Sequence, residues 1–109
     1  MNGTSLAWTD VGHIDDIPRL GSRVVSTSSV DIAVFRTSGD LVFALHDTCP
    51  HKAGKLSQGI VHGESVTCPL HNWVIGLADG KAKGPDEGCS RTVPVRLRDG
   101  RILLAVGAT

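Results

Sequence analysis

Short runs of β-branched and other apolar residues alternate with polar residues along most of this chain, which is the period-two pattern of β-strands. Ser, Thr, Gly and Asp residues separate the runs, and Asp99-Gly100 is typical of a tight hairpin turn because both residues accept positive φ. No window of about 12 residues has the spacing of an amphipathic helix. We therefore expect strands in the segments 24–25, 30–35, 41–45, 59–61, 65–67, 73–77, 93–97 and 101–106.

The arrangement of these segments predicts an all-β fold. Roughly nine or ten short strands at this spacing are typical of small sandwiches and barrels. A chain of 109 residues fits one domain, and no linker or low-complexity segment divides it. We therefore predict a single domain over residues 1–109, built from small antiparallel sheets with sandwich- or barrel-like packing.

Charge and hydropathy exclude several classes of partner. Eleven basic and eleven acidic residues give a formal net charge of zero, without a block of like charge, so neither nucleic acid nor a membrane surface is expected as a partner. The N-terminal segment lacks the basic start and apolar run of a signal peptide, and no stretch reaches the roughly 18 apolar residues of a membrane span. We therefore expect a cytoplasmic protein.

Two cysteine–histidine pairs carry the candidate chemistry. Cys49 and His51 follow the predicted strand 41–45, and the sequence then repeats the pairing with Cys68 and His71. In a reducing compartment, cysteine beside histidine indicates a metal or catalysis more often than a disulfide. Both pairs leave the ends of predicted strands, in loops at about residues 47–57 and 68–73, so the two loops could close over one site.

The choice of metal depends on how the donors are grouped. Tetrahedral zinc would accept two thiolates and two imidazoles, but zinc fingers keep their cysteines together and carry the histidines on a helix. A Rieske [2Fe–2S] centre needs two cysteines on one iron and two histidines on the other, which two mixed loops can supply. Its oxidised charge sums to zero with neutral imidazoles. The pattern favours this centre, while zinc and an unmetallated site remain alternatives.

The segments around the pairs resemble those of a known family. "CPHKAGKLSQG" at 49–59, followed by "VTCPLHNWVIGLADGKAKGPDEG" at 66–88, is similar to the Rieske-type iron–sulfur domain. The resemblance runs from about residue 34 to 106 and is greatest to the small subunit of assimilatory NAD(P)H-dependent nitrite reductase, because of "LHNW" at 70–73 and "GPDEG" at 84–88.

This resemblance implies a Rieske-type fold in which Cys49, His51, Cys68 and His71 hold a [2Fe–2S] cluster. It also implies an electron-transfer small subunit of an enzyme that reduces nitrite to ammonium. The partner would be the large catalytic subunit, which carries flavin and sirohaem, and no catalytic residue is expected in this chain. Two other functions stay open: a free Rieske-type ferredoxin that serves a ring-hydroxylating oxygenase, and a structural subunit without a cluster.

Residues that this chain lacks predict the redox range. High-potential Rieske proteins carry an extra cysteine in each loop, and these two cysteines are joined by a disulfide. They also carry two hydroxyl groups that form hydrogen bonds to the sulfurs. Gly54 and Leu70 stand at the cysteine positions, and Trp73 and Ile75 stand at the hydroxyl positions. We therefore expect a potential near the low end of the Rieske range, around −150 mV. Trp73 is expected to pack beneath the second loop, and no ligand role is expected for Cys89.

Overall fold

The computed structural model describes residues 8–27, 30–47, 55–68, 73–82 and 90–105. These residues form short strands and two single-turn 3₁₀ helices, and none of them lies in an α-helix. No helix among them is long and apolar enough to cross a membrane. In chain order the elements are β1 (Trp8–His13), η1 (Ile14–Asp16), β2 (Ser22–Ser26), β3 (Asp31–Arg36), β4 (Val42–His46), η2 (Leu56–Gln58), β5 (Ile60–His62), β6 (Ser65–Thr67), β7 (Val74–Gly76), β8 (Thr92–Val93), β9 (Val95–Arg98) and β10 (Arg101–Ala105).

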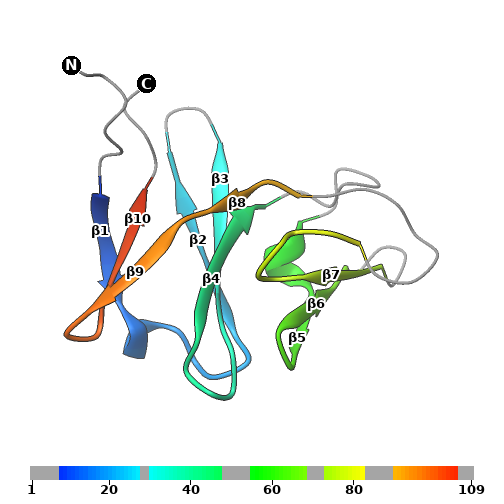
Figure 1. Ribbon diagram of the computed structural model, residues 1–109, viewed down its shortest axis with the longest axis horizontal. Helices are drawn as coiled ribbons and strands as arrows, with labels where there is room; N and C mark the ends of the chain where they lie inside the picture. Colours follow the sequence, from blue (N-terminus) through cyan, green and yellow to red (C-terminus); the bar gives the residue numbers. More distant parts are fainter. Residues whose placement is uncertain (1–7, 28–29, 48–54, 69–72, 83–89, 106–109) are drawn as a thin grey trace.

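The strands form three antiparallel sheets, which confirms the predicted all-β class. Their orders are β1-β10-β9, β2-β3-β4-β8 and β5-β6-β7. Along the longest dimension of the molecule, 42 Å, the four-stranded sheet lies between the other two (Figure 1). The sheet β5-β6-β7 therefore lies at the opposite end of the fold from β1, β9 and β10.

Strand β3 joins two hydrophobic cores because both of its faces are buried. Ala33 and Phe35 point into one cluster, and Ile32 and Val34 point into the other, as the period of two requires. The cluster around Phe35, which we call the site-side core, consists of Ala33, Phe35, Leu45, Leu56, Val61, Val66, Cys68, Ile75 and Leu77. The second cluster joins β3 to β10. Through these two clusters, β3 packs with residues from all three sheets. Burial of a side chain such as Phe35 contributes about 1.5–3 kcal/mol to the stability of this packing.

Several boundaries differ from those that the pattern predicts. Strand β1 was not predicted, because a bulge between Asp10 and Gly12 interrupts its alternation and half of its residues are exposed. The run 93–97 is divided into β8 and β9 at Pro94, which has no backbone N–H to donate to a ladder. The two 3₁₀ turns, at 14–16 and 56–58, were also missed, since three residues carry no period.

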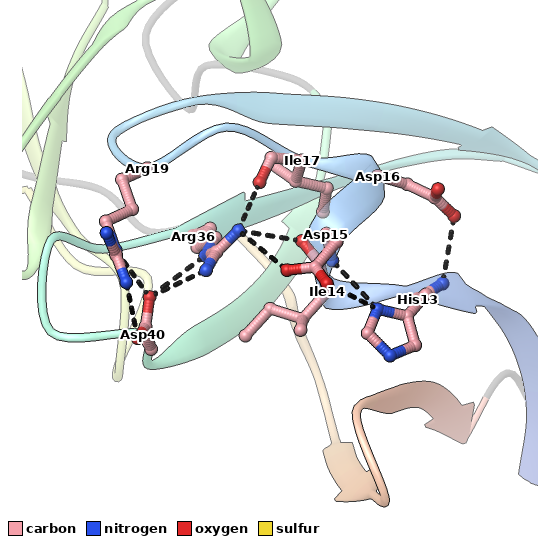
Figure 2. Close-up of polar contacts among 8 residues, drawn as sticks. All are labelled: His13, Ile14, Asp15, Asp16, Ile17, Arg19, Arg36 and Asp40. Carbon is pink, nitrogen blue, oxygen red and sulfur yellow. Dashed lines mark hydrogen bonds and ion pairs between the residues drawn. The ribbon is translucent and has the colours of Figure 1, made fainter.

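A buried arginine ties η1 to the turn between β3 and β4 (Figure 2). The guanidinium of Arg36 donates from Nη1 to the carbonyl oxygens of Ile14, at 3.1 Å, and Ile17, at 2.8 Å. It also donates from Nε and Nη2 to Oδ1 of Asp40, at 3.1 and 2.9 Å, and Arg19 donates to both oxygens of the same carboxylate. These bonds, from Arg19 first and Arg36 second, lower the pKa of Asp40 to about 2.

Candidate metal centre

Of the four predicted ligands, the structure describes Cys68. It directly follows β6 and is fully buried, on the same face of the strand as Val66. Both side chains belong to the site-side core. Cys49, His51 and His71 lie outside the described residues, as does Cys89.

The second predicted loop is closed at its base by a backbone hydrogen bond. The N–H of Cys68 donates to the carbonyl oxygen of Trp73 at 2.7 Å, across residues 69–72. Trp73 is half-buried and packs against the site-side core, to which Cys68 and Ile75 also belong. Trp73 thus packs into the protein as predicted, whereas residues 69–72 of the predicted loop lie outside the described residues.

The first predicted loop is closed by a carboxylate. Asp47, which directly follows β4, accepts hydrogen bonds from both the backbone N–H and the hydroxyl of Ser57, each at 2.7 Å. The backbone N–H of Asp47 donates to the carbonyl oxygen of Asp31 at 2.9 Å. Residue 47 is thereby fixed to both η2 and the start of β3.

A third connection brings residues 80 and 90 to the end of β4. The N–H of Ser90 donates to the carbonyl oxygen of Gly80 at 2.7 Å, and its hydroxyl donates to the carbonyl oxygen of His46 at 3.0 Å. Gly80 has φ +71, and a Cβ at this position would collide with the backbone oxygen of Ser90. Glycine is therefore required here both by conformation and by space. Burial and the nearby Arg91 lower the pKa of His46.

The closures of the two predicted ligand loops adjoin one core. Leu45, Leu56 and Cys68 all belong to the site-side core, so the ends of both predicted ligand loops are held on the same side of the molecule. A buried cysteine at the base of a loop suits a thiolate–iron bond, because a cluster of zero net charge can be buried at little Coulomb cost. The described residues contain no group of three or more His, Cys, Asp or Glu side chains that could hold a metal ion by themselves.

Sequence reasoning predicted the cysteine and histidine positions as ligands, which stays a prediction, and it missed the residues that close the loops. Asp47 and Ser57 are ten positions apart and match no motif, and Ser90 lies far along the chain from His46. The available signal was the position of Asp47, which stands between the end of a strand and the first predicted ligand.

Comparison with known families decides the class of the protein. The model of the Rieske [2Fe-2S] domain matches residues 7–94. The chain belongs to this family. The match begins nearer the N-terminus than the resemblance predicted from residue 34 and does not extend to 106.

Curated relatives of this Rieske protein are ferredoxins of dioxygenase systems. The anthranilate 1,2-dioxygenase ferredoxin subunit of Burkholderia cepacia is 37% identical over 109 residues, which cover 98% of this chain and 100% of the relative. The ferredoxin component of the naphthalene 1,2-dioxygenase/salicylate 5-hydroxylase systems of a Ralstonia species is 31% identical, over 89% of this chain and 93% of the relative.

Solved structures confirm the Rieske fold without separating its branches. A carbazole 1,9a-dioxygenase ferredoxin, in complex with its oxygenase, has a TM-score of 0.84 at 24% identity, covering 96% of this chain and 98% of that one. A protein from Mycobacterium tuberculosis assigned as the small subunit of NADH-dependent nitrite reductase has a TM-score of 0.85 at the same identity, covering 96% and 99%. Both functions are thus compatible with this fold.

Family membership assigns the cofactor and the general role. The chain is a Rieske-type electron-transfer domain, and its cofactor is a Rieske-type [2Fe–2S] cluster. When bound, this cluster supplies one-electron transfer. Among the described residues, the protein contributes the hydrogen bonds that close the loops and the hydrophobic core that contains Cys68.

Proposed function

We propose that this chain is a Rieske ferredoxin that carries single electrons to the oxygenase component of an aromatic ring-hydroxylating dioxygenase system. The observation that carries the proposal is the 37% identity to the anthranilate dioxygenase ferredoxin subunit, which extends over essentially the whole of both chains. A separate carrier needs no catalytic site of its own. On this proposal residues 1–109 act as a single cytoplasmic module.

In the same proposal, four residues hold the cluster. The thiolates of Cys49 and Cys68 bind one iron, and the imidazoles of His51 and His71 bind the other. The spacing of the two pairs and the full burial of Cys68 at the base of the second loop support this assignment. The closures at Asp47–Ser57 and Cys68–Trp73 would hold the two ligand loops at a fixed separation.

A second candidate function is the small subunit of NAD(P)H-dependent nitrite reductase, whose partner would be a large catalytic subunit carrying flavin and sirohaem. The motifs at 70–73 and 84–88 favour it. So does a solved protein assigned as the small subunit of nitrite reductase (NADPH), which is 27% identical with a TM-score of 0.79 and covers 91% of this chain and 98% of that one.

Reconstitution distinguishes the two candidates. The loaded protein is purified from its own host, and the fractions are tested for a co-purifying sirohaem protein by its visible absorbance. The purified protein is then added to the reductase and oxygenase components of the same host, and substrate-dependent NAD(P)H oxidation is measured. A ferredoxin restores oxygenase turnover and purifies without sirohaem. Stoichiometric co-purification with a sirohaem protein, without oxygenase turnover, would establish the nitrite reductase subunit instead.

A further inference from the structure

A buried carboxylate closes the first predicted ligand loop, and none of the described residues forms an ion pair with it. The residue Asp47 is 5% exposed, and both of its carboxylate oxygens accept hydrogen bonds from a single residue, Ser57, at 2.7 Å each. Distances of this length are typical of charge-assisted hydrogen bonds. Among the residues that the structure describes, no ion pair involves Asp47: the nearby ammonium group of Lys55 lies 3.8 Å from Asp31 instead.

The carboxylate belongs to a chain of hydrogen bonds through three elements. The hydroxyl of Ser22, on β2, donates to the carbonyl oxygen of Ser57 at 2.7 Å. Ser57, on η2, donates twice to Asp47, whose own N–H donates to the carbonyl oxygen of Asp31. Asp47 and Ser57 are thus held by β2 and β3, which belong to the central sheet. Residues 47 and 57, which flank the part of the sequence that contains Cys49 and His51, are joined by this one pair.

Stability alone does not account for this arrangement. Burying a carboxylate that has no ion pair among the described residues is costly, and replacing both partners of a buried hydrogen bond by apolar groups of the same shape can be nearly neutral or stabilising. The carboxylate provides a fixed connection across the loop through two hydrogen bonds, which an apolar residue could not provide. We propose that Asp47 and Ser57 form a positioning clamp, which sets the spacing of Cys49 and His51 and places a negative charge beside the cluster.

Two consequences separate the clamp from an ordinary structural contact. Hydrogen-bonding partners outside the ligand set typically change metal affinity by about 10–100-fold, so breaking the clamp should hasten loss of the cluster. A fixed negative charge opposes the arrival of an electron, so its removal should raise the reduction potential. The inference rests on the proposed ligands Cys49 and His51 and is independent of which protein accepts the electron.

The test uses two variants that break the clamp differently. Asp47→Asn removes the charge and one acceptor, whereas Ser57→Ala removes one donor and keeps the charge. Ser57→Thr keeps both donors and serves as the rescue. Asp40→Asn is the matched control, because Asp40 also accepts several hydrogen bonds but lies at the opposite, turn end of β3 and β4. Each loaded protein is challenged with an iron chelator while its visible absorbance is followed, and its potential is measured by voltammetry.

We expect cluster loss to be roughly 10-fold or more faster in Asp47→Asn and Ser57→Ala than in the wild-type protein, and unchanged in Ser57→Thr. The potential should rise in Asp47→Asn and should not rise in Ser57→Ala. If both clamp variants lose iron no faster than Asp40→Asn and keep the wild-type potential, the clamp is refuted. Should Asp47→Asn fail to fold, Ser57→Ala and Ser57→Thr decide the question by chelator rate. Retention of the cluster by Cys49→Ser would instead refute the ligand assignment.

Discussion

Replacing Arg36 with methionine tests how much of the fold's stability depends on the network at the β3–β4 turn. The substitution keeps the length of the side chain and removes four hydrogen bonds, two to backbone carbonyls and two to Asp40. An unsatisfied buried polar group costs about 1–3 kcal/mol, and breaking a buried ion pair costs about 3–5 kcal/mol. The side chain of Asp40 is 43% exposed and keeps its ion pair with Arg19, so water screens the charge that Arg36→Met leaves behind. The cost therefore lies at the lower end of the range for breaking a buried ion pair. We expect Arg36→Met to lower the free energy of unfolding by about 3 kcal/mol.

The loss is measured by thermal unfolding at one heating rate, followed by far-ultraviolet circular dichroism. For a domain of this size, 1 kcal/mol corresponds to roughly 4 °C, so the midpoint should fall by about 12 °C. Arg19→Met is the matched control, because Arg19 binds the same carboxylate from an exposed position and should change the midpoint little. Equal midpoint shifts for the two variants, or a loss below about 1 kcal/mol for Arg36→Met, would show that the buried network is not a main source of stability.

Three further predictions concern pH, ligands and potential. The folded-state pKa of Asp40, about 2, lies below the ordinary aspartate value of 3.8, so its contribution to stability is complete above pH 3.8 and is lost as the pH falls toward 2. The denaturant midpoint of Asp40→Asn should therefore vary less over this range than that of the wild-type protein. Iron and sulfide analysis should show no cluster after replacement of any proposed ligand by serine or alanine, and a full cluster in Cys89→Ser; the ligands are Cys49, His51, Cys68 and His71. Protein-film voltammetry should give a potential around −150 mV that changes with pH as the ligand histidines titrate. A pH-independent value near +300 mV would contradict the argument that the potential is low because residues 73 and 75 carry no hydroxyl group.

The parts of the structure that the sequence predicts are those set by near neighbours in the chain. The apolar residues in 30–35 predict β3 because a short apolar run bounded by turn residues is typical of a strand buried on both faces. The cysteine–histidine spacing predicts a metal site because each donor pair lies within four residues. Strand β1 escapes prediction because its register is set by β10, about ninety residues further along: Asp10 lies opposite Leu103.

The same reason explains which parts of the candidate site were missed. The hydrogen bonds that close its loops join residues that have no common pattern, such as Ser90 with His46 and Ser57 with Ser22. Each of these bonds exists only because the folded chain brings two residues together that are far apart in the sequence. Local sequence therefore predicts which residues bind the metal, whereas the contacts that close the loops around them come from tertiary packing.

From the proposed role of Asp47, we expect the hairpin of β3 and β4 to carry residues that set stability at one end and residues that tune the potential at the other. Its turn end carries Arg36 and Asp40, whereas its open end carries Asp31 and Asp47. Six residues of strand at about 3.3 Å each place the two ends roughly 17 Å apart, beyond the distance at which substitutions usually couple. A variant at the turn end should therefore lower the unfolding midpoint and leave the potential unchanged, and Asp47→Asn should raise the potential by the same amount in the wild-type and Arg36→Met proteins. A potential shift that differed between these two backgrounds would mean that the strands transmit strain between the turn and the cluster, and that the clamp does not act locally.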